Sequence, residues 1–252
     1  HDVTNAQFAR FVAATGHVSV AERTPTVAAK AGAAPAAGSA VFVFPKDGRP
    51  GAWRFIAGAD WRHPQGPGSS IEGRDNHPVV HIAYEDALAY ARWLGRELPT
   101  EAQWEYASRG GLDAQPYAWG EAFTPDGRPM ANTWQGPFPL VNTGDDRFMG
   151  TSPVGCFPAN GYGLYDMAGN VWQWTRSWYR PGHSGQAETN PLGPHQRDAY
   201  DTRQPGVPVL VIKGGSHLCA PNYCARYRPA ARQPQDPSFG TSHIGFRTVA
   251  AP

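Results

Sequence analysis

Two of the three cysteines in this 252-residue chain, Cys219 and Cys224, are separated by only four residues, whereas Cys156 lies far upstream. Side chains five positions apart on an ideal strand point to opposite faces, so the two sulfurs converge only if the chain turns between them. Pro221 and Asn222 are typical turn residues and could supply that turn. Two converging thiolates suit Cu(I), and they suit reversible disulfide formation equally well. The alternative is a pair of small buried apolar groups.

A buried strand is predicted at residues 209–212, and it delivers the chain directly to the cysteine segment at 214–228. Residues 162–174 alternate large and small groups and predict a turn that feeds another strand. A last strand is predicted at 243–249. Shorter strands are expected at 41–44 and 77–82.

Helices are predicted from capping patterns and apolar spacing. Thr4 as N-cap with Gln7 three residues later forms a capping box, and Gly16 should end the first helix. A second capping box, Thr100 with Gln103, begins another helix. Between them a helix is expected over about 84–94, with an inner stripe at Ala87, Leu88, Ala91 and Leu94.

Irregular segments occupy much of the remaining chain. Residues 24–40 are mostly small and predict a mobile loop, while residues 119–158 are polar, rich in glycine and without a period. A long irregular stretch inside a compact domain is usually functional or held by something other than secondary structure, and bound metal is one candidate. With no internal repeat and no long linker, residues 1–252 are expected to form one loop-rich α+β domain with limited secondary structure.

The composition sets limits on function. The chain has 29 Gly, 25 Pro and nine Trp with a net charge of +1, which favours a loop-heavy fold pinned by aromatic side chains. Near-zero charge gives no reason to expect nucleic acid or an anionic membrane as partner, and no apolar stretch is long enough to span a bilayer. No secretion signal is present in the chain as given. An odd number of cysteines argues against a disulfide scaffold and favours a reducing compartment.

Several motifs together resemble the formylglycine-generating enzyme (sulfatase-modifying factor) family. The pattern Gly-Gly-Ser-x-x-Cys-x-x-x-Tyr-Cys-x-Arg-Tyr-Arg at 214–228 carries most of the resemblance. Further matching segments follow in the family's order and cover nearly the whole chain, at residues 3–5, 77–79, 98–105, 109–112, 132–136, 162–174, 230–232 and 245–247. The resemblance implies the family's fold, which is related to the C-type-lectin scaffold.

The family resemblance also implies an activity. Family members oxidise a cysteine in a Cys-x-Pro-x-Arg segment of sulfatases to Cα-formylglycine, using molecular oxygen and Cu(I). By resemblance, Cys219 and Cys224 hold copper, Ser216 and Trp172 line the oxygen-side pocket, and Tyr223 orients the second cysteine or the peptide. A monomer in the bacterial cytoplasm is expected. Two alternatives remain open: the same chemistry on another cysteine-containing peptide, and a non-catalytic binding domain.

The resemblance further implies two structural calcium sites made of oxygen donors. The first set is Asn132, the Thr133 carbonyl, Asp146 and the Phe148 carbonyl. The second set is Asp166, the Gly169 and Val171 carbonyls, and Gln173. At the second site the family commonly has Asn first and Glu last, so the carboxylate has moved from one end to the other. The alternative for both sets is turn capping.

The sequence departs from the family pattern in three ways. The two or three strands that usually precede the first helix are expected to be missing from the chain as given. The cysteines for the extra structural disulfides of animal members are absent, which is consistent with a bacterial, reducing setting. Ala220 and Pro221 stand where close relatives often have His or another polar residue, and residues 233–239 differ from the usual tail. The last two segments would line the peptide groove, so they bear on substrate identity.

Other polar residues are expected to be structural. His77 and His81 invite a metal interpretation, but Pro78 and a predicted strand remove the helical geometry that would align them. Glu101 and Glu105 are expected to be a helix N-terminal charge and a buried or capping partner. Cys156 is expected to be a packed thiol.

Overall fold

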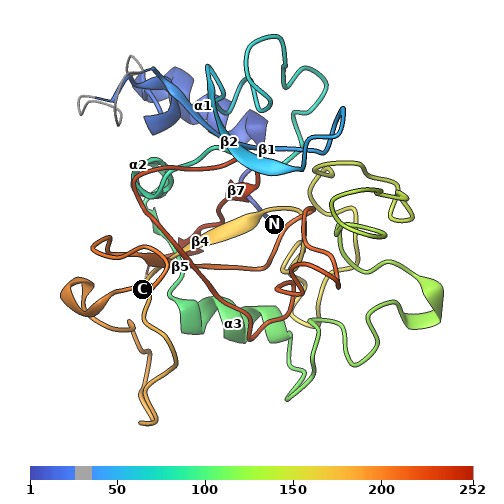
Figure 1. Cartoon of the computed structure of the whole chain (residues 1–252). Helices are drawn as coiled ribbons and strands as arrows, with labels where there is room; N and C mark the ends of the chain where they lie inside the picture. The colour runs from blue at the N-terminus through green and yellow to red at the C-terminus, as the bar shows by residue number, and fades with distance from the viewer. Residues whose placement is uncertain (26–35, 252) are drawn as a thin grey trace.

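The structure is a computed structural model, and it describes residues 1–25 and 36–251 (Figure 1). Its helices are α1 (Asn5–Thr15), α2 (Tyr84–Trp93) and α3 (Glu101–Arg109), with single turns η1 (Val20–Glu22), η2 (Pro125–Gly127) and η3 (Gln196–Asp198). Its strands are β1 (Gly38–Val43), β2 (Ala52–Ala57), β3 (Arg96–Glu97), β4 (Trp172–Trp178), β5 (Leu210–Lys213), β6 (Gln233–Gln235), β7 (Ile244–Gly245) and β8 (Val249–Ala250). Short elements joined by long loops confirm the predicted loop-rich α+β fold. Most of the mobile loop predicted over 24–40 lies outside the described residues.

A four-stranded sheet, in the order β6-β5-β4-β7, forms the centre of the fold. Trp174 of β4 pairs with Ile212 of β5, and both side chains are fully buried. The sheet crosses the middle of Figure 1, with α3 on one side and the β1–β2 hairpin on the other. The strand predicted at 209–212 is confirmed with a shift of one residue, and it brings the cysteine segment to the end of this sheet.

Both predicted capping boxes are present. The Gln7 backbone N–H donates to Thr4 Oγ1 over 3.2 Å, and the Gln103 N–H donates to Thr100 Oγ1 over 3.1 Å. Each helix ends at a glycine in the left-handed region, α1 at Gly16 with φ 68°. These helix ends were predictable because a capping box is a contact between residues three apart in sequence.

The inner face predicted for α2 is partly wrong. The buried residues of this helix are Asp86, Ala87, Tyr90 and Ala91, whereas Leu94 is 43% exposed. Asp86 is buried because its carboxylate accepts backbone N–H groups from Ala83 (3.0 Å) and from Val20 (3.1 Å). A carboxylate with these hydrogen-bond partners can be buried in the core. The buried face of α2 therefore includes Asp86 and leaves Leu94 exposed.

Two strand predictions are also wrong. Residues 77–82 make one isolated bridge, between Thr4 and Pro78, and His81 has a positive φ of 61°, which a strand does not allow. The predicted final strand at 243–249 is two short pieces, because β7 pairs with β4 while β8 pairs with β3. The hairpin strand β2 was not predicted.

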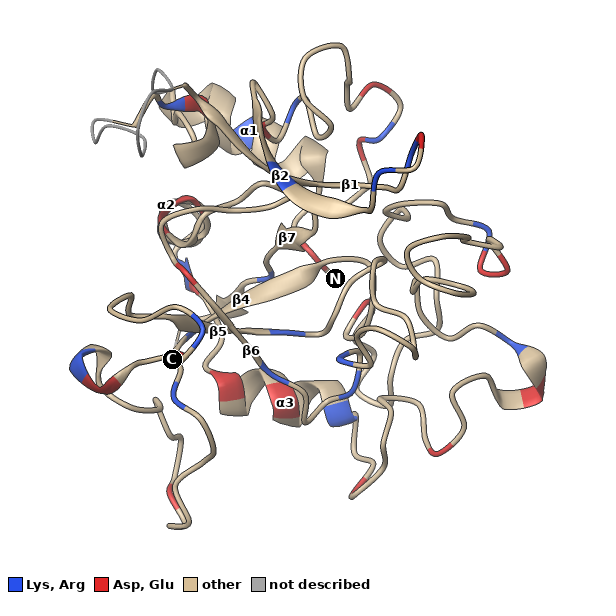
Figure 2. Ribbon diagram, in the orientation of Figure 1, with Lys and Arg blue, Asp and Glu red and all other residues tan. Residues whose placement is uncertain are grey.

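Charge is dispersed over the molecule. Lysine and arginine (blue) and aspartate and glutamate (red) are scattered along the ribbon, in agreement with the net charge of +1 (Figure 2). Within residues 1–25 and 36–251, no helix has the length and apolar character needed to cross a membrane.

Candidate active site

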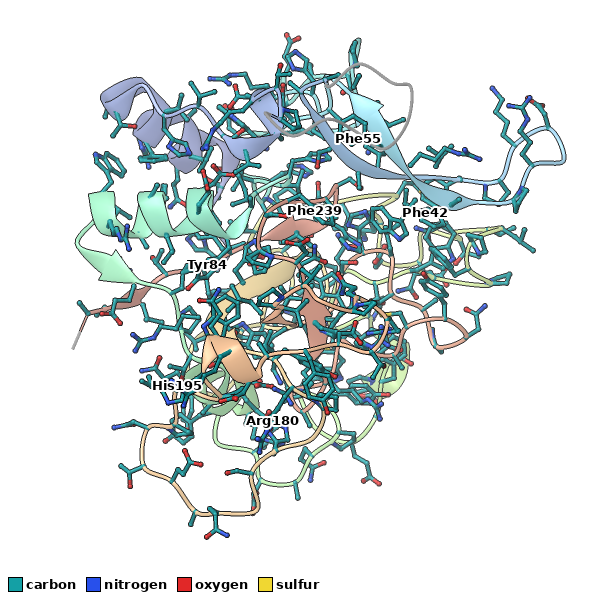
Figure 3. The ribbon with its side chains drawn as sticks, turned by 60° about the vertical axis from the view of Figure 1, so that its left-hand side comes forward. Phe42, Phe55, Tyr84, Arg180, His195 and Phe239 are labelled. Carbon is teal, nitrogen blue, oxygen red and sulfur yellow. A yellow bond between two sulfur atoms is a disulfide. The ribbon has the colours of Figure 1, made fainter. Side chains whose placement is uncertain are left out.

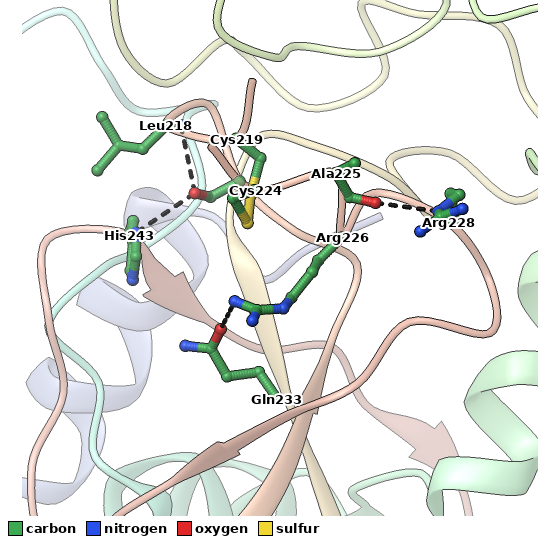
Figure 4. The surroundings of a disulfide bond; sticks show 9 residues. Leu218, Cys219, Cys224, Ala225, Arg226, Arg228, Gln233 and His243 are labelled. Carbon is green, nitrogen blue, oxygen red and sulfur yellow. Dashed lines mark hydrogen bonds between the residues drawn. A yellow bond between two sulfur atoms is a disulfide. The ribbon is translucent and has the colours of Figure 1, made fainter. Parts of the chain in front are cut away.

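The two neighbouring cysteines are brought together by the predicted turn. Ala220 O accepts the backbone N–H of Tyr223 over 3.0 Å and that of Cys224 over 2.8 Å. The Cα atoms of Cys219 and Cys224 are 4.6 Å apart, and the structure joins their sulfurs as a disulfide (Figure 4). Convergence of these sulfurs, which the sequence predicted only if the chain turned, is confirmed.

Two glycines connect β5 to the cysteine segment. Gly214 has φ 96° and Gly215 has φ 70°, values that L-residues with a side chain rarely adopt. A Cβ on Gly215 would lie 2.9 Å from the Tyr227 backbone nitrogen. This close approach lets the chain fold back on itself after Lys213 and places the cysteines beside the sheet.

A cavity of about 550 Å³ opens beside the cysteines. Its walls are aromatic and polar, and among the lining residues are Phe42, Trp53, Phe138, Trp172, Ser216, Cys219, Tyr223, Cys224, Arg226, Phe239 and His243. Tyr223 is 58% exposed and stacks on Phe138, with ring centroids 4.3 Å apart. All five residues that the sequence proposed as catalytic therefore line a single cavity.

Ser216 and Trp172 are fixed within this cavity by hydrogen bonds. Ser216 Oγ accepts the Leu218 backbone N–H over 3.3 Å and lies 3.3 Å from Nδ1 of His243. The Trp172 backbone N–H donates to the His243 carbonyl over 2.8 Å. His243 was not predicted to belong to the site, because a single histidine in an expected strand has no diagnostic spacing.

Two further cavity residues were missed for a similar reason. Trp53 comes from β2, which was not predicted, and its ring packs edge-on against His243 with centroids 4.5 Å apart. Arg226 lies two residues after Cys224 and donates to Gln233 Oε1 over 2.6 Å. The family motif contains this arginine, but the motif alone does not say which way the side chain points.

The cysteine pair has the chemistry of a low-coordinate soft-metal site. Cys219 is 2% exposed and Cys224 is 8% exposed, and reduction of their disulfide would leave two thiols side by side at the cavity wall. Among the residues described, no group of three or more His, Cys, Asp or Glu side chains could hold a metal ion. Two sulfur donors without further protein ligands fit Cu(I), which accepts low coordination by soft ligands.

Cys156 differs from the sequence prediction of a packed thiol, because it is a free and exposed cysteine. The pKa of its thiol is nevertheless raised, first by partial desolvation and then by the nearby Asp166 carboxylate. A thiol with a raised pKa is a weak nucleophile near neutral pH.

The residues of the first predicted calcium site lie together around Asp146. Its Oδ1 accepts the Phe148 backbone N–H over 3.0 Å, and its Oδ2 accepts the Thr133 N–H over 3.1 Å. Asn132 is buried beside them and donates to the Gly150 carbonyl over 2.8 Å. Burial raises the pKa of the Asp146 carboxyl, and the two backbone hydrogen bonds lower it again in part.

No lysine or arginine forms a salt bridge with Asp146 in the part of the chain that the structure describes. A buried carboxylate beside Asn132 and Thr133 and without a protein cation suits a hard divalent ion such as Ca²⁺.

The residues of the second predicted calcium site do not fit the ion in the same way. Gln173 Oε1 accepts hydrogen bonds from Trp104 Nε1 and from Arg247 Nε, each over 2.6 Å. The Asp166 carbonyl accepts from Gln173 Nε2 and from Arg247 Nη2, each over 2.8 Å. Gly169 donates its N–H to the Gly214 carbonyl over 2.9 Å.

These contacts occupy Gln173 Oε1 with two hydrogen bonds and place the Arg247 guanidinium beside the predicted donors. Val171, the remaining predicted donor, is fully buried. The Arg247 guanidinium therefore competes with a cation at this set, and a second calcium ion stays a prediction.

His77 and His81 are structural, as expected. His77 Nδ1 bonds to Thr151 Oγ1 over 2.9 Å, whereas the buried His81 ring bonds through Nε2 to the Pro64 carbonyl over 2.9 Å. Burial lowers the pKa of His81 to about 4. The two rings have separate partners, so they do not form one site.

A second cavity, of about 610 Å³, lies beside α3 at the end of the molecule marked by Arg180 and His195, away from Phe42 and Phe55 (Figure 3). Its two glutamates on α3 are paired within the protein. Glu101 bonds to Arg232 over 2.6 Å, and Glu105 bonds to the buried Lys213 over 3.2 Å. These ion pairs confirm a structural role for both glutamates, so no reaction is assigned to this cavity.

The fold and the first cavity define a class of protein: one α+β unit that presents a cysteine pair in an aromatic, partly enclosed site. The family model described as "Sulfatase-modifying factor enzyme 1-like domain" matches residues 1–252. The chain belongs to that family, which confirms the resemblance drawn from the sequence motifs.

Characterised relatives agree with this assignment. The chain is 51% identical to the formylglycine-generating enzyme of Mycobacterium tuberculosis over 100% of this chain and 86% of that protein. It is 48% identical to the Streptomyces coelicolor enzyme of the same name, over 97% of this chain and 74% of that protein. It is also 50% identical to the Bos taurus protein named inactive C-alpha-formylglycine-generating enzyme 2, over 79% of this chain and 58% of that protein.

Solved structures show the same fold at low sequence identity. PvdO from Pseudomonas aeruginosa matches with a TM-score of 0.60 and 22% identity, over 98% of this chain and 77% of that chain. Treponema denticola variable protein 1 matches with a TM-score of 0.56 and 19% identity, over 84% and 91% of the two chains.

Proposed function

We propose that this protein oxidises a cysteine in a Cys-x-Pro-x-Arg segment of a sulfatase to Cα-formylglycine, with molecular oxygen as oxidant and Cu(I) held by Cys219 and Cys224. The observation that carries the proposal is the cysteine pair, which forms the wall of a cavity large enough for a peptide side chain and its neighbours. The name of two relatives supports formylglycine as the product, and the description of the family supports a sulfatase as the substrate.

The chemistry balances as a two-electron oxidation. The substrate cysteine loses its S–H hydrogen and one Cβ hydrogen to give a thioaldehyde, and water then replaces sulfur, which leaves as hydrogen sulfide. Oxygen takes up the two electrons and two protons as hydrogen peroxide, or forms water if a thiol reductant supplies two more electrons. Bound Cu(I) would supply the one-electron redox chemistry that a thiol and molecular oxygen do not provide without a metal.

The residues of the chain have separate tasks in this reaction. Reduction of the Cys219–Cys224 disulfide is needed first, because thiolates and not a disulfide bind metal. The indole of Trp172 and the Ser216 hydroxyl form the wall beside the cysteines. Tyr223, stacked on Phe138 at the exposed edge, is placed to contact the peptide as it enters.

A calcium ion around Asp146 belongs to the same proposal. It would neutralise a buried carboxylate and hold the loop that contains Phe148 against Asn132 and Thr133.

The proposal is tested with a synthetic Cys-x-Pro-x-Arg peptide, reduced protein, Cu(I) and oxygen. We expect mass spectrometry to show loss of the peptide thiol and gain of an aldehyde. A peptide of the same composition in scrambled order is the control, and equal turnover of both would favour another cysteine-containing substrate. Copper binding without any turnover would favour a non-catalytic member of the family, such as the relatives named inactive.

A further inference from the structure

Two proposed active-site residues, Ser216 and Trp172, are both joined to His243. The carbonyl of His243 accepts the Trp172 backbone N–H over 2.8 Å. The next residue, Ile244, begins β7 and pairs in parallel with Trp172 of β4. The backbone of His243 is thus fixed by the central sheet, and its ring lines the cavity.

The ring of His243 is held in one orientation. Nδ1 lies 3.3 Å from Ser216 Oγ, and the Trp53 ring packs edge-on against the imidazole at 65°. Ser216 Oγ already accepts the Leu218 backbone N–H over 3.3 Å. The Ser216 hydroxyl still has its one hydrogen to donate, and His243 Nδ1 lies within reach of it. We therefore assign Nδ1 as the acceptor, which leaves the ring proton on Nε2.

The imidazole is suited to accept a hydrogen bond and unsuited to take a proton. Burial lowers the pKa of His243 well below its ordinary value, with smaller contributions from the neighbouring His217 and His81. The ring therefore stays neutral at physiological pH. A neutral acceptor orients a hydroxyl without removing its hydrogen.

We propose that His243 is a positioning residue that accepts the Ser216 hydroxyl hydrogen, so that the serine presents an oxygen lone pair to the cavity beside the cysteine pair. This inference rests on the proposed function, because that cavity is where the peptide cysteine would be oxidised.

The tautomer can be measured on the protein without copper or peptide. Long-range 1H–15N correlation spectra should show an unprotonated Nδ1 and a protonated Nε2 for His243, assigned by loss of the signals in His243→Asn. The Nδ1 resonance should move in Ser216→Ala. It should stay in place in Thr241→Val, a matched control that removes from the same cavity a hydroxyl with no hydrogen-bond partner among the described residues.

Turnover of the Cys-x-Pro-x-Arg peptide tests the consequence. His243→Leu removes the acceptor and should lower kcat about tenfold, the effect of losing one oriented hydrogen bond, with KM little changed. His243→Asn keeps an acceptor near the position of Nδ1 and should retain most of the wild-type kcat. In a Ser216→Ala background the leucine substitution should cause no further loss, because the two residues act as a unit.

A protonated Nδ1, equal kcat values for the Asn and Leu variants, or additive losses in the double variant would each overturn the inference. The failure of the proposed function is a separate result. A wild-type protein that turns over no peptide contradicts the function and the role of His243 in it, whereas active wild type with indistinguishable His243 variants contradicts the inference alone.

Discussion

At the scale of single residues, two buried carboxylates illustrate different ways of stabilising negative charge. Asp146 accepts hydrogen bonds from neutral N–H groups of Phe148, Thr133 and Gln135, whereas Asp166 lies near the Arg247 guanidinium, which lowers the pKa that burial raises. Because Asp146 has no protein cation beside it, we expect calcium to bind there. Because Arg247 already supplies a positive charge near Asp166, we expect calcium to bind less readily at that position.

Calcium should stabilise the protein through Asp146. At a calcium concentration 100 times the dissociation constant the gain is about 2.7 kcal/mol, or a rise in Tm of roughly 5–10 °C for a chain of this size. Asp146→Asn should abolish the difference in Tm between calcium and EDTA. Asp145→Asn, in the exposed neighbouring position, should retain it. A calcium effect that survives in Asp146→Asn would show that the ion binds elsewhere.

Arg247 should contribute strongly to stability without any metal. Its guanidinium bonds to Gln173 Oε1 and the Asp166 carbonyl and lies 4.0 Å from the buried Asp2 carboxylate. Arg247→Met leaves these groups without their cation and should cost about 3–5 kcal/mol in urea unfolding.

The exposed substitution Arg10→Met is the control for Arg247→Met and should change stability by less than about 0.5 kcal/mol. An equally small loss for Arg247→Met would mean that its hydrogen bonds and charge are not needed.

Prediction at this scale succeeded where a contact is local. Pro221 and Asn222 indicated the turn that joins the cysteine sulfurs, and the structure contains it. His243 and Ser216 are twenty-seven positions apart, and nothing in the sequence between them indicates that they touch. The hydrogen bond from Arg247 to Gln173 was not predictable for the same reason, because the two residues are seventy-four positions apart in the sequence.

At the scale of elements, the Gly214–Gly215 link after β5 determines whether the cavity forms. Gly215 and Gly16 have similar positive φ values, 70° and 68°, but a Cβ at Gly215 meets the Tyr227 backbone while a Cβ at Gly16 meets nothing within 4 Å. Gly16→Ala should therefore cost about 1 kcal/mol, and Gly215→Ala about 2–4 kcal/mol because steric overlap adds to the backbone strain.

Urea unfolding of these two alanine variants measures the difference, and peptide turnover reports on the cavity. Gly215→Ala should lose activity, because Ser216 and Cys219 follow the displaced link directly, while Gly16→Ala should retain it. Equal losses of stability in the two variants would contradict the steric argument.

Elements were predicted well when their signals lie within the element. Capping boxes and the apolar run before Lys213 are local patterns, and both gave correct elements. Residues 77–82 had a strand composition but lie in an irregular segment that bonds to Val3 and Thr241. Among residues 1–25 and 36–251, the hairpin strand β2 pairs with β1 alone, and its exposed aromatic residues gave no clear alternation.

At the scale of the whole molecule, His81 should make stability depend on pH. Its folded pKa is about 4, below the ordinary value of 6.5, so the unfolded state binds the proton more tightly between these values. The contribution is complete above pH 6.5 and falls by about 3 kcal/mol as the pH decreases to 4. Protonation is resisted because the buried Nδ1 has no hydrogen-bond partner among the described residues.

The measurement is the free energy of unfolding at several pH values in wild type and His81→Asn, a residue that tolerates the positive φ. The difference between the two proteins should change by about 1.4 kcal/mol per pH unit below pH 6.5. Asp2, whose pKa is raised by burial, affects stability with the opposite sign and cancels in this difference. The exposed His195→Asn variant should follow wild type, and parallel curves for His81→Asn would refute the prediction.

The overall architecture was predicted through family motifs more than through periodicity. Residues 119–158 have no period, and their order comes from contacts such as Asn132 to Gly150 and Asp146 to Thr133. Hydrogen bonds from side chains to distant backbone groups hold such loops in place, and no periodic pattern in the sequence predicts these bonds. Family membership supplied the arrangement that local patterns could not.

The central claim is that the reduced Cys219–Cys224 pair binds Cu(I) and carries the oxidation of a peptide cysteine. The most direct measurement follows copper stoichiometry and aldehyde formation together in reduced wild type, Cys224→Ala and Cys156→Ala. One copper per chain with aldehyde formation is expected for wild type and Cys156→Ala, and neither for Cys224→Ala. Unchanged aldehyde formation in Cys224→Ala would contradict the account.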